Sequence, residues 1–430
     1  MKEKSHRESG KLTRRDFVRT SAVVGAATLA SSASNMFAAG SDKLRIGLVG
    51  CGGRGTGAVK DCVASSKGVE LVAMGDLFKD RLDGSLKDLK KNLGGKAKVT
   101  RETCFVGFDA YKKVIACDVD MVILAAPPGF RPIQLKAAIE AGKHVFMEKP
   151  VAVDPAGIRS VIASSELAAQ KGLGIVAGTQ RRHQKHYIDI MQRIHDGAIG
   201  EIRAGQCYWN GGDMIGYWKW WEPTATLKGM EWQCRSWPWF TWLSGDHIVE
   251  QHVHNLDVIA WALDAHPVQC VGVGGRQVRT QGNIYDHFAV EFEYPNGVRI
   301  SSMCRQINGC TNNVSERVVG TKGTSYTDGS IGQIFGAKYY KYEGTNPNPY
   351  IVEHTDLIAS IRAGEPLNEG KRVAESTMAA VMGRMSAYTG RALKWDWAMN
   401  ASKLDLSPEQ YEFGPLATRA VAVPGKESLI

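Results

Sequence analysis

Short apolar runs alternate with longer mixed segments through the first half of this chain. The runs occupy residues 44–49, 69–74, 120–125, 144–147 and 174–177. Runs of this length, bounded by glycine or acidic residues, are typical of parallel strands buried on both faces. The segments between them predict helices at residues 58–66, 132–141 and 155–170. The alternation therefore predicts an α/β fold with a parallel sheet that is covered by helices.

A glycine-rich loop follows the first predicted strand. It reads Gly50-Cys51-Gly52-Gly53-Arg54-Gly55, which has GxGxxG spacing between a predicted strand and a predicted helix. In this setting Gly50 permits the tight turn, Gly52 lets the backbone approach a pyrophosphate, and Gly55 lets helix and strand pack closely. The helix N-terminus adds free N–H groups for phosphates. The loop predicts a dinucleotide site, with a plain structural turn as the alternative.

Asp76, at the end of the second predicted strand, indicates which dinucleotide binds. A carboxylate at this place accepts hydrogen bonds from the adenosine ribose hydroxyls and repels a 2′-phosphate. The sequence therefore favours NAD over NADP, although Lys79 and Arg81 follow closely.

Two further loops should meet the glycine loop in one crevice. Ligands of open α/β sheets bind outside the carboxyl ends of the strands, and residues 126–131 and 148–150 each follow a predicted strand. We therefore expect Ala126 and Pro127 to contact the cofactor.

At residues 141–150 the chain reads Ala-Gly-Lys-His-Val-Phe-Met-Glu-Lys-Pro. This segment looks like the AGKHVxxEKP signature of the Gfo/Idh/MocA family, which includes glucose–fructose oxidoreductase and inositol dehydrogenase. The resemblance implies an N-terminal Rossmann NAD-binding domain at residues 43–181. It also implies a C-terminal α/β domain at residues 182–430, built on a large, mostly antiparallel sheet. One face of that sheet would cover the nicotinamide, and the other often mediates oligomers.

The same resemblance gives roles to the end of the signature. It implies that Lys149 lies at the nicotinamide and the reacting hydroxyl, where an ammonium stabilises a developing oxyanion. Glu148 would orient Lys149 or contact the nicotinamide ribose. Pro150 is commonly preceded by a cis peptide bond in this family. The alternative is a surface lysine before a turn proline.

Residues 244–257 lie where the family places a helix with an acid, a histidine four residues later, and a second acid. Positions four apart share one helical face, so Glu250 and His254 are expected to point together into the crevice. The resemblance implies that His254 is the general base, although Glu250 replaces the family's usual Asp. With His247, the same face also allows a zinc site as an alternative; the hydride mechanism requires no metal, and none is predicted.

Several other residues are weaker candidates for substrate contact. They are Arg131, Arg181, Arg182, His252, Tyr285 and Asp286. Arg131 departs from the family, in which many relatives carry His. Residues 209–242 are interpreted as an insertion and hold eight of the eleven tryptophans. These rings could stack on sugar faces, or they could serve packing or a dimer interface.

The first 40 residues predict an export leader. Thr13-Arg14-Arg15-Asp16-Phe17-Val18 resembles the twin-arginine signal, and a small, apolar stretch follows at residues 21–30. That stretch is shorter than the ~20 residues of a membrane span, so a cleaved leader is favoured over a retained anchor. The expected location is the periplasm, with membrane contact only during export.

Charge and cysteine content narrow the remaining function classes. The formal net charge is +9, but residues 1–40 carry seven Lys or Arg against three acids, and long basic runs are missing elsewhere. This distribution argues against nucleic-acid binding. The nine cysteines are odd in number and contain no CxxC pair, so we interpret them as mostly buried thiols.

Together these features predict an NAD-dependent oxidoreductase that acts on a ring hydroxyl of a sugar or glycoside and holds its cofactor tightly. A homo-oligomer is expected. One alternative is an NAD-dependent glycosidase that works by oxidation, elimination and re-reduction, without net redox change. A second is a non-catalytic sugar-binding protein. The sequence leaves these alternatives open.

Overall fold

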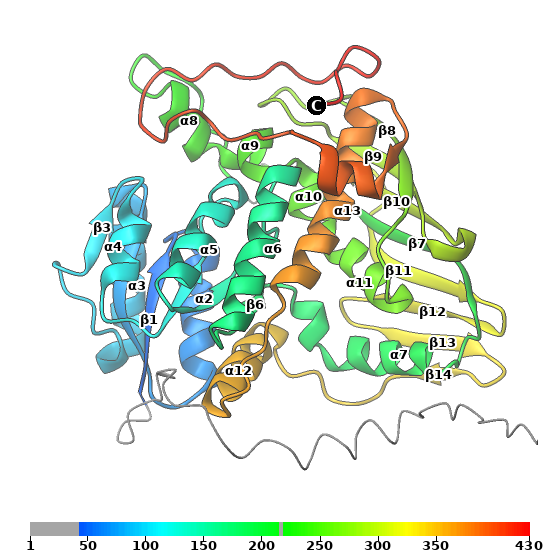
Figure 1. Ribbon diagram of the computed structural model, residues 1–430, viewed down its shortest axis with the longest axis horizontal. Helices are drawn as coiled ribbons and strands as arrows, with labels where there is room; N and C mark the ends of the chain where they lie inside the picture. Colours follow the sequence, from blue (N-terminus) through cyan, green and yellow to red (C-terminus); the bar gives the residue numbers. More distant parts are fainter. Residues whose placement is uncertain (1–42, 215–217) are drawn as a thin grey trace, which may run out of the picture. The chain divides into compact units, whose positions relative to one another are not determined.

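The computed structural model describes residues 43–214 and 218–430. The predicted leader at residues 1–40 lies outside the described residues and stays a prediction. Residues 43–430 form one compact unit that contains two β-sheets with helices around each of them (Figure 1).

The first sheet has six parallel strands in the order β3-β2-β1-β4-β5-β6. They are β1 (Leu44–Val49), β2 (Val69–Asp76), β3 (Cys104–Val106), β4 (Met121–Leu124), β5 (His144–Met147) and β6 (Ile175–Ala177). Its helices are α2 (Gly53–Ser65), α3 (Lys79–Leu93), α4 (Ala110–Ala116), α5 (Arg131–Glu140) and α6 (Pro155–Gln170). The predicted Rossmann sheet is therefore confirmed, and β1, β5 and α6 have the predicted bounds.

Two local predictions need correction. The first helix begins at Gly53, five residues before the predicted start, so the second half of the glycine loop is already helical. Strand β3 was not predicted, because it has only three residues, lies at the sheet edge and is only partly buried.

Helices cover both faces of this sheet. Helices α4, α5 and α6 pack on one face, and α2 and α3 pack on the other. The second face is completed by α12 (Pro349–Arg362), whose Leu357, Ile358 and Ile361 are buried against the strands. Figure 1 shows α12 beside α2 and β6. The predicted partition at residue 181 therefore does not hold for α12, because the chain returns to the first sheet.

The second sheet has nine strands in the order β14-β13-β12-β11-β7-β10-β9-β8-β15. They are β7 (Ile202–Gly211), β8 (Gln269–Gly275), β9 (His287–Glu293), β10 (Arg299–Gln306), β11 (Asn313–Gly320), β12 (Gly323–Asp328), β13 (Gly332–Gly336), β14 (Tyr340–Lys341) and β15 (Leu393–Lys394). Strands β7 and β10 are parallel, and the other neighbours are antiparallel. The predicted large, mostly antiparallel sheet is confirmed.

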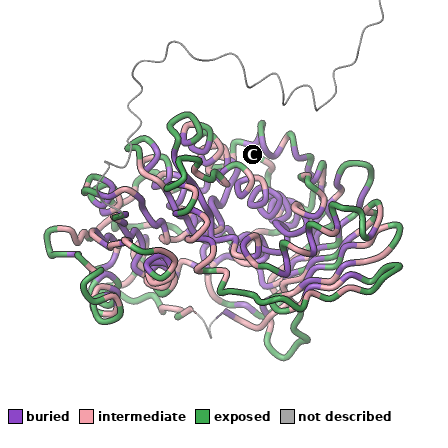
Figure 2. Tube along the Cα trace, turned by 90° about the horizontal axis from the view of Figure 1, so that it is seen from below, coloured by how far each residue is buried: buried purple, intermediate pink, exposed green. Residues whose placement is uncertain are grey.

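One face of the nine-stranded sheet is buried under helices. Along β10 buried and exposed residues alternate, with Ile300, Ser302 and Cys304 pointing inward, as expected for a strand covered on one face. Helices α11 (Val253–Leu263) and α13 (Gly370–Thr389) pack on the inner face, and α7 (Lys185–His195) packs at the β12–β13 end. Helix α13 also packs on α6 and so joins the two sheets. Figure 2 shows buried residues along these central helices.

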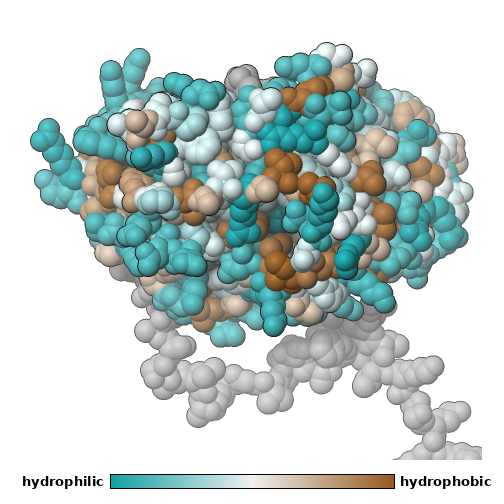
Figure 3. All heavy atoms as spheres, turned by 90° about the horizontal axis from the view of Figure 1, so that it is seen from above, coloured by the Kyte–Doolittle hydropathy of each residue, from teal (hydrophilic) through white to brown (hydrophobic). Residues whose placement is uncertain are grey.

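An inserted segment and the C-terminal tail lie on the same side of the molecule. The insertion follows β7 and contains α8 (Gly229–Arg235) and α9 (Thr241–Ser244), after which α10 (His247–Glu250) leads into α11. The tail runs from about residue 402 to 430 over α8 and α9 (Figure 1). Apolar residues gather in small patches among hydrophilic ones on this face (Figure 3).

All nine cysteines are free thiols, and six of them are buried: Cys51, Cys62, Cys207, Cys234, Cys270 and Cys304.

Across residues 43–214 and 218–430, none of the helices is both long and apolar enough to cross a membrane.

Candidate active site

A cavity of about 420 Å³ lies at the carboxyl ends of the parallel strands. Its wall includes the glycine loop, Asp76, the loop after β4, Lys149, Glu250 and His254. Loops of the parallel sheet and the helices α10 and α11 therefore face one space, which lies where the rule for open α/β sheets expects a ligand.

The glycines of the loop have separable functions. An added Cβ on Gly50, whose φ is +95°, would lie 2.4 Å from the Ala126 nitrogen, and one on Gly55 would lie 1.9 Å from the Gly50 oxygen. Gly50 and Gly55 are therefore required by packing. In contrast, a Cβ on Gly52 or Gly53 would meet nothing within 4 Å, although both residues line the cavity. This open space in front of the N-terminus of α2 fits a dinucleotide pyrophosphate.

Asp76 ends β2 at the cavity wall. Its Oδ2 accepts from the Cys51 backbone N–H at 2.6 Å, and its Oδ1 accepts from the Phe78 N–H at 2.8 Å. Burial raises the pKa of this carboxyl, and the two backbone hydrogen bonds oppose the shift. The carboxylate is thus fixed next to the glycine loop, where ribose hydroxyls can donate to its remaining lone pairs.

Lys149 and Glu250 meet across the cavity. The Lys149 Nζ donates to the Glu250 Oε1 at 2.9 Å and also to the Glu250 backbone oxygen. Burial raises the pKa of Glu250, and the charge of Lys149 lowers it. The Lys149–Pro150 peptide bond is cis, as the resemblance implied. With two donors held by Glu250, the ammonium keeps a third for a ligand.

His254 lines the same cavity from the first turn of α11. Its ring stacks on Trp209 with centroids 5.7 Å apart and planes 20° apart. Burial, followed by the charges of Lys149 and Arg181, holds its pKa well below the ordinary 6.5. The imidazole is therefore neutral at neutral pH and able to accept a proton.

Glu250 and His254 do not share one helix, contrary to the prediction. Helix α10 ends at Glu250, and α11 begins at Val253 after a break at Gln251, where φ is −111°. Both side chains nevertheless line the cavity.

Comparison with protein families matches both halves of the chain. Residues 44–179 match the model described as "Oxidoreductase family, NAD-binding Rossmann fold", and residues 187–326 match the "GFO/IDH/MocA C-terminal domain". The chain belongs to the GFO/IDH/MocA family. Its N-terminal domain is accordingly an NAD-binding Rossmann domain.

Curated relatives in this family share part of their length with this chain. Inositol 2-dehydrogenase 4 of Saccharopolyspora erythraea is 34% identical over 165 residues, which are 38% of this chain and 45% of the relative. Inositol 2-dehydrogenase of Azotobacter vinelandii is 25% identical over 268 residues, which are 60% and 65% of the two chains. The chain thus spans between about half and two thirds of these relatives.

Solved structures share the fold over a longer stretch. The aldose-aldose oxidoreductase of Caulobacter crescentus complexed with glycerol superposes with a TM-score of 0.64 at 20% identity, covering 82% of this chain and 99% of that one. The apo scyllo-inositol dehydrogenase of Lactobacillus casei gives a TM-score of 0.63 at 19% identity, covering 82% and 98%.

Of the two roles expected for Glu148, the contact with Lys149 is replaced by a hydrogen bond accepted from the Arg54 Nε. Glu148 still lines the cavity, so its contact with the nicotinamide ribose stays a prediction. Arg54 also binds Asp61 at 3.2 Å and Glu353 of α12 at 3.0 Å. In this family member the Arg54 side chain therefore links the glycine loop, the end of β5 and α12, and three carboxylates occupy its guanidinium.

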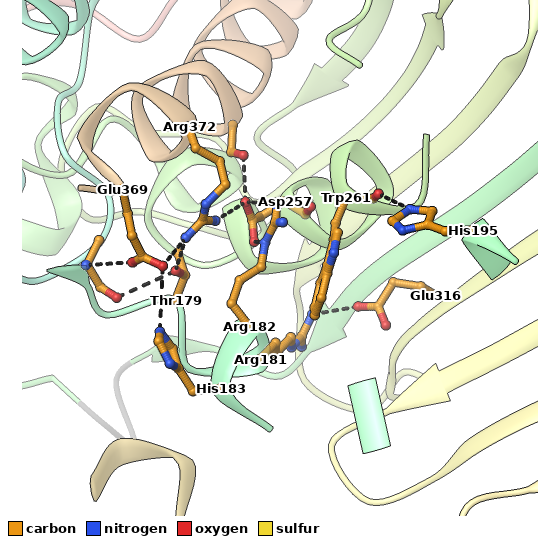
Figure 4. Close-up of polar contacts among 12 residues, drawn as sticks. Thr179, Arg181, Arg182, His183, His195, Asp257, Trp261, Glu316, Glu369 and Arg372 are labelled. Atoms are coloured by element: carbon orange, nitrogen blue, oxygen red, sulfur yellow. Dashed lines mark hydrogen bonds and ion pairs between the residues drawn. The ribbon is translucent and has the colours of Figure 1, made fainter. Parts of the chain in front are cut away.

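Arg181 and Arg182 do not reach the cavity, which corrects the prediction that they read substrate oxygens. Arg181 is buried against Glu316 of β11, and Arg182 makes two contacts with the Asp257 carboxylate, at 2.8 and 3.0 Å. Asp257 also accepts from Arg372, as Figure 4 shows. The two arginines hold residues 179–183, the crossover that connects the parallel sheet to the second half of the chain, against β11 and α11.

His252, Tyr285 and Asp286 are also absent from the cavity wall. His252 is buried with Nε2 2.7 Å from the Ser302 Oγ, and burial lowers its pKa to about 3. Tyr285 donates its hydroxyl to the Ala422 oxygen. Asp286 accepts three backbone N–H groups from residues 277–279. These side chains hold the fold together and do not face a ligand.

Arg131 does line the cavity, as predicted, but it is buried and donates Nη1 to the Leu124 oxygen at 2.6 Å. His247 is fully buried with its ring against Phe288 and does not line the cavity with Glu250 and His254, as the zinc alternative would require. Within the described ranges, no group of three or more His, Cys, Asp or Glu is arranged to hold a metal ion.

Among the tryptophans of residues 209–242, the cavity wall includes Trp218 and Trp237. Most of the others pack together or on neighbouring rings, such as Trp242 on Phe130. The wall also includes residues that the sequence did not single out, among them Phe78, Phe108, Gln180, Arg235 and Tyr350. Of these, only Gln180 could have been suspected from the sequence, because it directly precedes Arg181 and Arg182, which were candidates for substrate contact.

The two kinds of loop glycine make a testable contrast. Gly55→Ala should destabilise the fold by about 1–3 kcal/mol, because its Cβ overlaps a fixed backbone oxygen. Gly52→Val should keep the fold and abolish NAD binding, because the side chain enters the pyrophosphate space. Thermal unfolding and calorimetric NAD titration measure both, with Gly57→Ala of the same helix as control. Normal NAD affinity in Gly52→Val would contradict the assignment.

Proposed function

We propose that this chain is an NAD-dependent oxidoreductase acting on a ring hydroxyl of a sugar or glycoside. The observation that carries the proposal is the meeting of Lys149, Glu250 and His254 in the cavity that the glycine loop and Asp76 also line. The relatives named as inositol dehydrogenases and an aldose oxidoreductase support a polyhydroxylated ring as substrate.

The side chains divide the chemistry between them. Neutral His254 accepts the proton of the hydroxyl that is being oxidised. Lys149 donates its free N–H to that oxygen and stabilises the negative charge developing on it. Glu250 holds the ammonium in place through its carboxylate and its backbone oxygen. When bound, the nicotinamide supplies the hydride acceptor.

Substitution of the two reacting side chains should separate chemistry from folding. Lys149→Ala and His254→Ala should reduce turnover by roughly 10²–10⁴ and leave NAD binding intact. In the wild type, turnover should persist as the pH falls through 6.5, since burial holds the His254 pKa below that value. Steady-state kinetics against pH tests both expectations. Near-normal turnover in His254→Ala would assign the base elsewhere.

A redox-neutral cycle is the finer proposal. The ring hydroxyl is oxidised, and the neighbouring C–H then loses a proton. The glycosidic leaving group departs with its bonding electron pair, water adds, and the ketone is reduced by the hydride first removed. The predicted export leader motivates this cycle, because free NAD is scarce outside the cytoplasm. A cofactor bound before export and recycled in place avoids that limit, and we propose a periplasmic location on the same ground.

Isotope exchange without added cofactor tests this cycle. As-purified enzyme should convert glycosides carrying deuterium on ring carbons, with sustained turnover and wash-in of solvent hydrogen beside the oxidised carbon. NADH release in proportion to product, with turnover dependent on added NAD, would leave an ordinary dehydrogenase. Unchanged glycosides with tight sugar binding would favour the non-catalytic alternative.

We also propose a homo-oligomer through the outer face of the nine-stranded sheet. Val271 and Val273 of β8 and Met303 of β10 are 53%, 66% and 44% exposed on that face. Sedimentation should show a wild-type oligomer that dissociates when Val273 and Met303 are both changed to Lys. Val106→Lys, at an exposed valine of the first sheet, is the matched control. A monomeric wild type would contradict this proposal.

A further inference from the structure

One end of the cavity is lined by aromatic side chains around Asp76. Phe78 follows Asp76 on the turn into α3, and Phe108 and Tyr111 follow β3. Since Asp76 stands where the adenosine ribose binds, these rings border the adenosine end of the dinucleotide site.

Arg235, the last residue of α8, reaches this end from the inserted segment. Its Nη1 and Nη2 donate to the two carboxylate oxygens of Asp80 on α3, at 2.9 and 3.0 Å. Its guanidinium also lies 3.9 Å from the centre of the Phe78 ring. The hydrogen bond from Arg235 lowers the pKa of Asp80. A planar guanidinium makes both contacts at once, which a lysine cannot do.

The C-terminal tail covers the same rings from outside. Phe413 stacks on Phe78 with centroids 5.9 Å apart and meets Phe108 edge-on at 5.0 Å. Tyr411 contacts Phe108 and Phe130. Phe413 is 48% exposed, so it lies on the outer side of the cluster.

The tail and α8 are bonded to each other. The Met230 N–H donates to the Gly414 oxygen at 3.0 Å, and the Gln233 side chain donates to the Leu416 oxygen at 3.1 Å. Figure 1 shows the tail running over α8. Residues 229–235 and 411–416 therefore form one unit, which we call the adenosine clamp.

We propose that the adenosine clamp retains the cofactor, with Arg235 and Phe413 as the residues that close it. The proposal rests on the function proposed above, and it names the part of the chain that keeps NAD bound between turnovers. Both segments originate outside the Rossmann strands and helices. Arg235 lines the end of the cavity where the adenosine would sit, and Phe413 packs behind the Phe78 and Phe108 rings of its wall. The dinucleotide then leaves only after the Arg235–Asp80 pair and the ring contacts separate.

The contacts set the size of the expected effect. An exposed ion pair contributes little by itself, and Asp80 is largely exposed. The bidentate geometry and the cation–π contact with Phe78 add to it. We expect loss of Arg235 to raise the rate of cofactor release about tenfold, which corresponds to about 1.4 kcal/mol.

Release of NADH from the full chain, followed by fluorescence after a chase with excess NAD, measures this rate directly. Arg235→Ala and Phe413→Ala should each release NADH about tenfold faster than the wild type. Asp80→Arg combined with Arg235→Asp should recover part of the loss by restoring the pair in reverse. Arg193→Ala, which removes an ion pair with Asp189 and a cation–π contact with Tyr340 away from the cavity, is the matched control and should leave the rate unchanged.

The unfolding temperature of each cofactor-free variant distinguishes clamping from a loss of fold, and it should stay close to the wild-type value. Wild-type rates in both Arg235→Ala and Phe413→Ala would overturn the proposal, and so would rapid NADH release from the wild type. Slow release from the wild type, faster release from the variants and no turnover of any sugar would support the clamp while removing the proposed function.

Discussion

The contact between Lys149 and Glu250 is the constraint on which the site depends. Lys149 follows β5 of the parallel sheet, and Glu250 ends α10 beside the second sheet. Both side chains are largely buried, so each charge has lost much of its hydration and needs the other. The pair fixes the distance between the Rossmann domain and the wall that carries His254. A displacement of α10 away from the end of β5 has to separate these charges.

Other buried charges are compensated in the same way, by partners distant in sequence. Arg54 and Glu353 are 299 residues apart, Arg181 and Glu316 are 135 apart, and Arg182 and Asp257 are 75 apart. Figure 4 shows how the crossover at residues 179–183 is held between α11 and α13. Because removal of one partner from a buried pair is costly, these networks fix how the two halves meet.

The sequence predicted those features that local patterns determine. Strands β1 and β5 and helix α6 were found because continuous apolar runs and capping residues mark their ends. The glycine loop was located by its GxGxxG spacing after a strand, and Asp76 by its place at the end of the next strand. Lys149 was located by the resemblance of residues 141–150 to a family signature. Helix α12 was missed as a part of the first domain, since its place depends on a contact with α2 across nearly 300 residues.

Arg181, Arg182 and His252 were misassigned for a related reason. Their residue types suit ligand binding, but their carboxylate and hydroxyl partners come from β11, α11 and β10. Nothing near them in sequence shows that these partners exist. Arg235, in contrast, was missed although it lines the cavity. It lies in the Trp-rich insertion outside any motif, and only the fold places it beside Asp80.

The burial of the cysteines has a consequence for the chemistry that the interior can undergo. Oxidants attack the thiolate form, and burial raises the pKa of Cys270 to about 12 and shifts those of Cys51, Cys62 and Cys207 upward as well. These sulfurs therefore stay protonated and inaccessible at neutral pH. Cys310, which is exposed, is the thiol that an oxidising medium reaches first. Once the protein has folded, its buried thiols therefore remain reduced even in an oxidising compartment.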